Sequence, residues 1–264
     1  MVRLSIVMPV YNERSTILSA IERVLAVDYP CPVELVVVDD GSVDGTPEVL
    51  APLVGVRVVR HPVNRGKGAA VRSGVDHATG THLIILDADL EYSPADIPLM
   101  LEPVLDGRAD HVFGTRVFGL NTRYPSFRFA MGGRALTFAA NVLYDSCLTD
   151  MHTCLKLVPV EDFRVLTLTE DGFGLDTELT ARLIRGGVRP YEVPVSYNGR
   201  TVADGKKIAW RDGVRCLSIL AKVRAERQPQ VLATTPRRTD VSTARPRQRW
   251  RVAAEHAIDD RAAS

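Results

Sequence analysis

The stretch HLIILDADLEYSP, from His82 to Pro94, changes character in its middle. Its four apolar residues, Leu83–Leu86, are typical of a short strand buried on both faces of a sheet. The acidic loop Asp87–Glu91 follows directly, at the carboxyl end of that strand, where open α/β sheets keep their ligands. Carboxylates crowded there repel one another unless a cation lies among them, and oxygen ligands favour Mg²⁺ or Mn²⁺. The alternative is a solvated turn that caps the next helix.

Strand and helix patterns alternate on both sides of this stretch. We expect strands at Leu4–Met8, Glu34–Val38, Val56–Arg60, Leu83–Leu86, Asp110–Gly114 and Arg189–Val195, and shorter pieces near Cys154–Val158. We expect helices at Ser15–Val27 (with Ser15 as N-cap), Gly66–Ala78, Ser126–Tyr144 and Leu175–Arg185, and Pro47 in the first turn of another. This alternation predicts an α/β fold with a mixed, mainly parallel sheet flanked by helices. Residues 1–227 should form one domain, and the proline-rich segment 228–264 a disordered tail.

Composition narrows the class of protein. The 264 residues are 45% hydrophobic and 25% charged, which is ordinary for a soluble globular protein. A formal net charge of +1 argues against nucleic acid as the main partner. The four cysteines have no spacing typical of a disulfide framework or a zinc site. Because no signal peptide or membrane-spanning run is evident, we expect a cytoplasmic protein that meets a membrane only from the side.

Polar residues also follow the first two expected strands. Tyr11 and Glu13 leave the first, and Asp39 and Asp40 end the second, so all should meet the acidic loop at one sheet edge. Carboxylates there can accept hydrogen bonds from a base or a ribose. The segment Asn64–Gly68 opens a helix with backbone N–H groups and two cations, which suits an anionic ligand. Each feature alone is more often a turn or a cap, but together they favour a nucleotide site.

Eight segments in order carry a resemblance to a known family. They are VMPVYNE, VVVDDGSVDGT, NRGKGAAVRSG, LDADLEYSP, FGTR, LTDMHTCLKL, DGFGLDTELTARL and VPVSYNGRTVADGKKIAWRDG. The first four are similar to the catalytic domain of family 2 glycosyltransferases, which have the GT-A nucleotide-sugar-binding fold. The later four resemble the branch that moves a sugar from a nucleotide onto a polyprenyl phosphate, the dolichyl-phosphate mannose and glucose synthases. The similarity spans Leu4 to Leu220, most of the chain.

The resemblance implies roles for residues at matching positions. Those that would bind the nucleotide sugar are Pro9, Tyr11, Glu13, Asp39, Asp40, Lys67 and Asp87. Those that would hold Mg²⁺ or Mn²⁺ are Asp87, Asp89 and Glu91, with Asp89 the firmest ligand, although mannose synthases commonly have Gln at the position of Glu91. Those that would act in catalysis are Asp89, Arg116, Asp150, Arg200 and Lys207, with Lys206 adding positive charge. The family's Thr-Asp-x-x-Ser-Gly is replaced here by Thr149–Cys154, which leaves the transferred sugar open.

The chemistry of the acceptor decides whether a general base is needed. A phosphate monoester, whose second pKa is about 6, is already largely dianionic at neutral pH and needs none. We therefore expect a metal-dependent hexosyltransferase, with a donor of the GDP-mannose or UDP-glucose type and a polyprenyl-phosphate acceptor. The resemblance implies inversion at the anomeric carbon. One alternative is transfer to a saccharide hydroxyl in envelope polysaccharide synthesis, with Asp176 or Glu178 as base. Another is a non-catalytic protein that binds nucleotide sugars.

Two expected helices have an apolar face beside a basic stripe. In one, Trp210, Val214, Leu217 and Ala221 lie beside Arg211, Arg215 and Lys222. In the other, Phe127, Met131, Phe138 and Val142 lie beside Arg123, Arg128 and Arg134. Such faces suit the inner face of the cytoplasmic membrane, a second copy in a homo-oligomer, or packing on the protein's own core.

Overall fold

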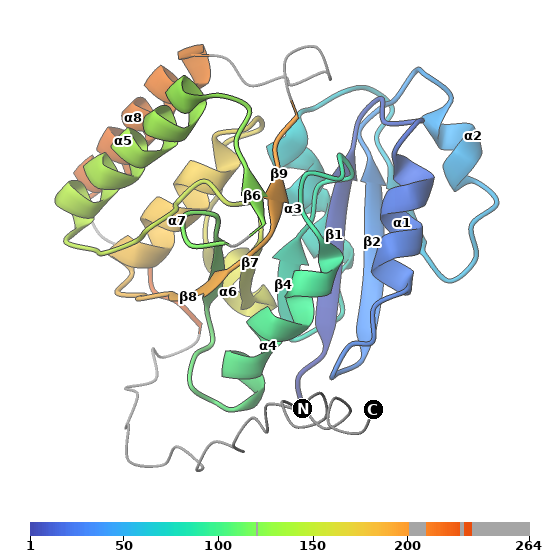
Figure 1. The fold of residues 1–264 in the computed structure, drawn as a ribbon, viewed down its shortest axis with the longest axis horizontal. Coiled ribbons are helices and arrows are strands. Elements are labelled where there is room, and N and C mark those ends of the chain that lie inside the picture. The colour runs from blue at the N-terminus through green and yellow to red at the C-terminus, as the bar shows by residue number, and fades with distance from the viewer. Residues whose placement is uncertain (120, 201–209, 228–229, 234–264) are drawn as a thin grey trace, which may run out of the picture.

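A seven-stranded sheet runs through the molecule in the order β3-β2-β1-β4-β7-β5-β8 (Figure 1). The computed structural model describes residues 1–119, 121–200, 210–227 and 230–233. The strands of this sheet are β1 (Leu4–Val10), β2 (Val33–Asp39), β3 (Arg57–Arg60), β4 (His82–Ile85), β5 (Val112–Thr115), β7 (Lys156–Pro159) and β8 (Tyr191–Pro194). Neighbours are parallel except at β7, which is antiparallel to both β4 and β5. The expected mixed, mainly parallel sheet is confirmed.

Helices cover both faces of this sheet. They are α1 (Ile17–Leu25), α2 (Thr46–Leu50), α3 (Lys67–His77), α4 (Ile97–Leu105), α5 (Phe127–Tyr144), α6 (Val160–Val165), α7 (Leu175–Arg185) and α8 (Trp210–Ala225), with a short 3₁₀ helix at Pro94–Asp96. The expected helix ranges agree within two residues at each end. The N-cap of α1 is Thr16 rather than Ser15, because the helix begins two residues later than the pattern suggested. Pro47 lies in the first turn of α2, as expected.

The core forms two layers because successive side chains of each strand point to opposite faces. In β4, Ile84 packs into the layer that includes α1 and α4. Leu83 and Ile85 pack into the layer that includes α3, α6 and α7. All three side chains have no exposed surface. The apolar run before the acidic loop is therefore buried on both faces, as its sequence predicts.

Two glycines bring the start of α3 against the loop before α7. A Cβ on Gly66 would lie 2.3 Å from the carbonyl oxygen of Asp171, and one on Gly68 would lie 2.1 Å from that of Glu170. Gly66 also has φ +96°, a conformation that favours glycine. These contacts place the first turn of α3 and the first turn of α7 side by side, so Lys67 and Asp176 approach each other.

The helices α5 and α8 lie together at one side of the molecule, beyond the carboxyl ends of the strands (Figure 1). The hydroxyl of Tyr144 in α5 donates to the carbonyl of Leu220 in α8 at 2.6 Å. A small parallel pair, β6 (Thr122–Arg123) and β9 (Tyr197–Asn198), lies near the acidic loop, and Tyr92 forms an isolated bridge with Tyr197. None of the helices in the described part of the chain is long and apolar enough to span a membrane.

Some expectations fall on residues outside the described part of the chain. Lys206 and Lys207 are among these, as is the expected tail apart from residues 230–233. The domain boundary at residue 227 therefore stays a prediction.

Candidate active site

A cavity of about 860 Å³ opens at the carboxyl edge of the sheet and extends to α5 and α8. Its wall contains the following residues that the sequence suggested: Pro9, Tyr11, Glu13, Asp40, Lys67, Asp87, Asp89, Glu91, Arg116, Asp150 and Arg200. Asp39 is buried at the end of β2 and is not part of this wall, and Lys207 lies outside the described residues. The tertiary structure thus brings together residues separated by nearly two hundred positions.

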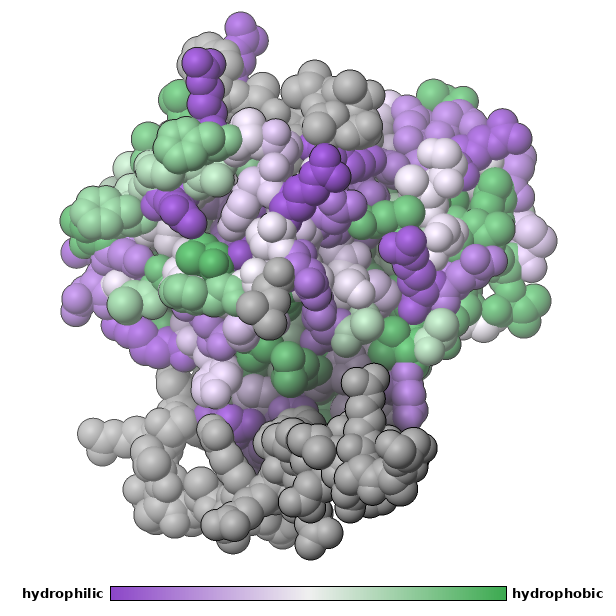
Figure 2. Space-filling view, viewed as in Figure 1, coloured by the Kyte–Doolittle hydropathy of each residue, from purple (hydrophilic) through white to green (hydrophobic). Residues whose placement is uncertain are grey.

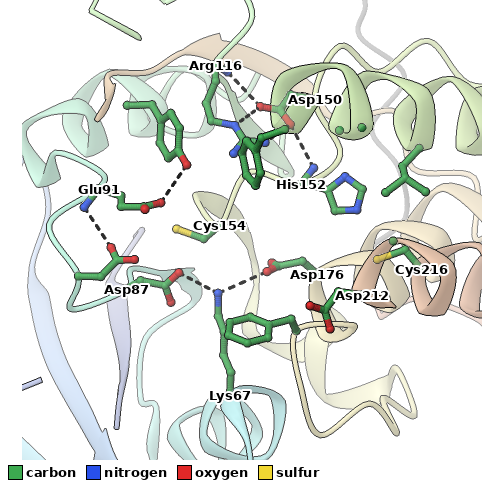
Figure 3. Close-up of a pocket in the computed structure, with 18 of the residues that line it drawn as sticks. Lys67, Asp87, Glu91, Arg116, Asp150, His152, Cys154, Asp176, Asp212 and Cys216 are labelled. Carbon is green, nitrogen blue, oxygen red and sulfur yellow. Dashed lines mark hydrogen bonds and ion pairs between the residues drawn. The ribbon is translucent and has the colours of Figure 1, made fainter. Parts of the chain in front are cut away.

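Lys67 occupies the centre of the cavity floor (Figure 3). Its Nζ lies 2.8 Å from Asp87 Oδ2 and 3.4 Å from Asp176 Oδ2. Burial acts to lower the pKa of Lys67, but Asp87 and Asp176 outweigh it and hold the pKa well above its ordinary value. Lys67 therefore stays charged and ties the acidic loop to the start of α7.

Arg200 pairs with three carboxylates of the cavity. Its Nη2 lies 3.0 Å from Asp89 Oδ2, its Nη1 3.6 Å from Glu13 Oε1, and its Nε 3.8 Å from Glu91 Oε1. Burial raises the pKa of Asp89 to about 6, with further contributions from Asp87 and Glu91. The carboxylates of the acidic loop thus carry more negative charge than Arg200 balances, which suits an additional cation.

The three carboxylates of the expected metal site do not lie close enough together to bind one ion. Among the described residues, no group of three His, Cys, Asp or Glu side chains is close enough to hold a metal ion. The reason is that Lys67 draws Asp87 toward α7, while Asp89 and Glu91 face Arg200. Two carboxylates still fit Mg²⁺ or Mn²⁺, because such ions in phosphate-transfer sites use one or two carboxylates and complete their shell with phosphate oxygens and water.

Arg116 and Asp150 form a buried pair at the roof of the cavity (Figure 3). Arg116 donates from Nε to Oδ2 at 2.6 Å and from Nη2 to Oδ1 at 2.8 Å. Its guanidinium also lies over the ring of Tyr197, 4.9 Å from the centroid. Two of its nitrogens are thus paired with Asp150, and the expected role of Arg116 at a phosphate stays a prediction.

Asp40 and backbone N–H groups of the segment Asn64–Gly68 form hydrogen bonds with each other. Asp40 accepts from the backbone N–H groups of Arg65 at 2.9 Å and Gly66 at 2.7 Å, and its Oδ1 lies 2.6 Å from His61 Nδ1. The N–H of Gly68 donates to the carbonyl of Asp171 at 2.6 Å. In this arrangement protein oxygens accept from the N–H groups of Arg65, Gly66 and Gly68, and the expectation that the segment receives an anion stays a prediction.

The two carboxylates suggested as general bases have different surroundings. Asp176 lines the cavity, 3.2 Å from Lys156 Nζ. Burial acts to raise the pKa of Asp176, but Lys156 and Lys67 outweigh it, so the pKa lies below its ordinary value. Glu178 accepts from the N–H groups of residues 169 and 170 and from Arg182, and it is not in the cavity wall. The expectation that Glu178 is available as a base is wrong, because its carboxylate is hydrogen-bonded to the loop before α7 and to Arg182.

Several lining residues were not singled out by sequence reasoning. They include Tyr92, Tyr124, His152, Cys154 and Tyr197. His152 and Cys154 lie in the segment that departs from the family pattern, so that departure was the available signal. The tyrosines gave no signal, since they meet only in the fold, where Tyr92 and Tyr124 both pack against the ring of Tyr197.

The far end of the cavity is largely apolar and lies between α5 and α8. The lining residues there include Phe129, Ala130, Gly133, Ala135, Leu136, Gly213, Val214 and Leu217. A Cβ added at Gly132 or Gly133 would meet nothing within 4 Å, so this end has open space. These two helices also contribute Arg128, Arg134 and Asp212 to the wall, so the cavity joins a charged end to a mainly apolar one.

Comparisons with known proteins agree with this geometry. The chain matches the Glycosyl transferase family 2 domain over residues 5–156. It is 33% identical to the glycosyltransferase AglJ of Haloferax volcanii over 196 residues, which is 74% of this chain and 63% of that protein. It is 38% identical to a dodecaprenyl-phosphate galacturonate synthase of Rhizobium johnstonii over 120 residues, 43% of this chain and 36% of that protein.

A solved structure with a similar fold is the glucosyl-3-phosphoglycerate synthase of Mycobacterium tuberculosis in complex with Mn²⁺, UDP and glucosyl-3-phosphoglycerate. It superposes with a TM-score of 0.63 at 21% identity, covering 84% of this chain and 80% of that one, which shows the fold alone. The sheet flanked by helices is thus the GT-A fold that the sequence led us to expect. Since the family domain covers more than half of its length, the chain belongs to glycosyl transferase family 2.

Proposed function

We propose that this protein is an inverting glycosyltransferase that moves a hexose from a nucleoside diphosphate sugar to a polyprenyl phosphate. The observation that carries the proposal is the continuous cavity from the acidic loop to the apolar gap between α5 and α8. Its charged end suits a diphosphate with a divalent cation, and its apolar end suits a lipid chain. The polyprenyl phosphate in the name of the Rhizobium relative and the Mn²⁺ and UDP in the mycobacterial complex support it.

The donor would enter from the ends of β1 and β2. Pro9, Tyr11 and Glu13 line that part of the cavity and would contact the nucleoside. Asp89 and Glu91, with Asp87 beside them, would hold Mg²⁺ or Mn²⁺. A bound cation of this kind would supply positive charge for the leaving nucleoside diphosphate. Arg200 already lies at these carboxylates, so it would turn from them to the diphosphate.

The acceptor's own charge makes a strong base unnecessary. A dianionic phosphate oxygen attacks the anomeric carbon, the bond from that carbon to the donor phosphate oxygen breaks, and the diphosphate leaves with the electron pair. No proton has to be removed. This fits Asp176, which two lysines keep ionised and weakly basic. The test is transfer from labelled UDP-glucose or GDP-mannose to undecaprenyl phosphate with Mn²⁺, and the absence of product from every such donor would contradict the proposal.

The α5 and α8 face would bring the enzyme to its lipid at the inner face of the cytoplasmic membrane. Exposed apolar side chains on these helices are Phe127, Met131, Phe138, Val142, Leu143, Val214 and Leu217. Figure 2 shows hydrophobic residues among charged ones over the α5 side of the molecule. The core contacts of α8 instead come from Cys216, Ile219, Leu220 and Val223. On the face named from the sequence, Val214 and Leu217 are exposed and also line the open end of the cavity, and the side chain of Trp210 is not described.

We expect Phe138→Ser to weaken membrane binding. Phe138 is 69% exposed, so the change costs no core packing but removes an apolar contact with lipid. Binding to vesicles of phosphatidylglycerol and phosphatidylcholine should fall about tenfold, and salt should release the wild type. Val54→Ser, at a position that is 95% exposed and far from α5, should bind as the wild type does. Equal binding by all three proteins in a flotation assay would refute the contact.

We expect Arg200→Ala to strengthen metal binding while it weakens catalysis. Without nucleotide, Arg200 competes with a cation for Asp89, so its removal should raise Mn²⁺ affinity roughly tenfold. Transfer should fall about a hundredfold or more, because the diphosphate loses a charge-assisted contact. Calorimetric titration with Mn²⁺ measures the first effect, and Arg72→Ala, whose partner Asp171 is elsewhere, is the control. Unchanged Mn²⁺ affinity, or an unfolded variant, would show that Arg200 has a structural role.

A further inference from the structure

His152 lies between the charged and the apolar ends of the cavity. It belongs to the loop between α5 and β7, and its ring lies in the cavity wall between Asp150 and Cys216 (Figure 3). The backbone N–H of His152 donates to Asp150 Oδ1 at 3.2 Å, which anchors the residue to the Arg116–Asp150 pair. The position of the ring is therefore set by the buried frame of the site.

The two nitrogens of the ring have different surroundings. His152 Nε2 lies 3.4 Å from the Thr177 hydroxyl oxygen, which itself lies 3.1 Å from Cys216 Sγ. The opposite nitrogen, Nδ1, is buried and has no hydrogen-bond partner in the described residues.

The surroundings keep this imidazole neutral. Burial and then Lys156 lower the pKa of His152 to about 4, although Asp150 acts in the opposite direction. A hydroxyl can both donate and accept, so it suits the Nδ1 of a neutral ring in either tautomer. A buried polar atom without a partner is unfavourable, so a ligand hydroxyl that reaches Nδ1 relieves that cost.

We propose that His152 Nδ1 forms a hydrogen bond with a hydroxyl of the transferred sugar and thereby helps to select that sugar. The inference rests on the proposed function. With the diphosphate at Asp89 and the acceptor chain between α5 and α8, the sugar is the group that bridges the two, and His152 lies on this path next to Asp176. His152 would be a specificity-determining residue, in the segment where this chain departs from its family pattern.

The experiment compares binding of nucleotides with and without a sugar. Dissociation constants are measured by calorimetry with Mn²⁺ for UDP, GDP, UDP-glucose and GDP-mannose, using the full chain, His152→Ala and His152→Gln. His152→Ala should change the dissociation constant of the nucleoside diphosphate by less than twofold. It should raise the dissociation constant of the corresponding nucleotide sugar about tenfold. His152→Gln should recover part of the lost affinity, because its amide can also form a hydrogen bond with a hydroxyl. His77→Ala, an exposed histidine of α3, should change neither.

Each outcome decides between the possibilities. If His152→Ala loses affinity equally for the nucleoside diphosphate and for the nucleotide sugar, His152 has a structural role only. If it loses affinity for neither, the inference is also overturned. If the wild type binds no nucleoside diphosphate, the proposed function itself falls and the inference falls with it. A change in the preference for UDP-glucose over UDP-galactose in kcat/KM, present in His152→Ala and absent in His77→Ala, would support selection of the sugar.

Discussion

Asp89→Asn is expected to reduce sugar transfer by about a thousandfold or more and to leave the fold intact. Asparagine keeps the shape of the side chain, and its oxygen can still accept from the N–H of Glu91, which lies 3.0 Å from Asp89 Oδ1. It cannot supply the negative charge that a divalent cation needs at this loop. The catalytic loss therefore comes from the cation site and not from packing.

The difference in stability between Asp89→Asn and the wild type depends on pH. The pKa of Asp89 is raised to about 6, so the folded protein binds this proton more tightly than the unfolded chain. Ionised Asp89 thus destabilises the metal-free protein, increasingly as the pH rises from about 4 to about 6, and Asp89→Asn removes that effect. Loss of the charged contact with Arg200 offsets part of the gain. The variant should therefore melt no lower than the wild type at pH 7 in EDTA.

Two measurements check this prediction. Transfer is followed with labelled donor in the presence of Mn²⁺, and melting is followed in EDTA at pH 4.5 and pH 7. Asp106→Asn is the control, because Asp106 is an exposed acid that pairs only with its neighbour Arg108 among the described contacts. Turnover by Asp89→Asn above a tenth of the wild-type rate would contradict a role in holding the cation.

Transfer to a polyprenyl phosphate is expected to exceed transfer to the matching polyprenol by about a thousandfold. The phosphate arrives as a dianion, whereas the alcohol must lose a proton, and general-base catalysis is typically worth 10²–10⁴-fold. Asp176 is a weak base because Lys67 and Lys156 hold its charge, and Glu178 is committed to backbone N–H groups and Arg182. The residues that the sequence offered as bases therefore do not favour a hydroxyl acceptor.

The comparison uses undecaprenyl phosphate, undecaprenol, 3-phosphoglycerate and a free disaccharide with each candidate donor. Product from the lipid phosphate alone supports the proposed function. Equal rates on the alcohol or the disaccharide would favour the polysaccharide alternative and require an effective base. Product from 3-phosphoglycerate alone would exclude the lipid, and binding of donor without any product would favour the non-catalytic alternative.

Matched variants test the route of the lipid chain. Gly133→Leu would place a side chain in the open space between α5 and α8, while Gly55→Leu would add the same bulk in a surface loop. Gly55 has φ +82°, so Gly55→Asn is the less strained form of this control. We expect Gly133→Leu to raise KM for undecaprenyl phosphate and to leave the affinity for the nucleoside diphosphate unchanged. An unchanged KM would place the chain elsewhere.

The amino-acid sequence by itself determined the central strands and the loop that follows them. An apolar run such as Leu83–Leu86 has one stable place, the middle of a sheet covered on both faces, and the carboxylates after it must then lie at the sheet edge. The resemblance also pointed to the charged residues at one end of the cavity, such as Asp89 and Arg200. These features depend on local pattern, which the sequence displays directly.

The tertiary structure alone decided the direction of β7 and the partners of each charge. The segment Lys156–Pro159 enters the sheet between β4 and β5, antiparallel to both, through contacts with strands far away in the chain. That insertion buries Lys156 beside Asp176, and the packing of α3 on α7 brings Lys67 to the same carboxylate. A charge in a sequence has no partner until the fold supplies one, and a buried ion pair forms only where packing excludes water and fixes both groups. For this reason the sequence could name the carboxylates of the site, but only the fold could show which cation each of them holds.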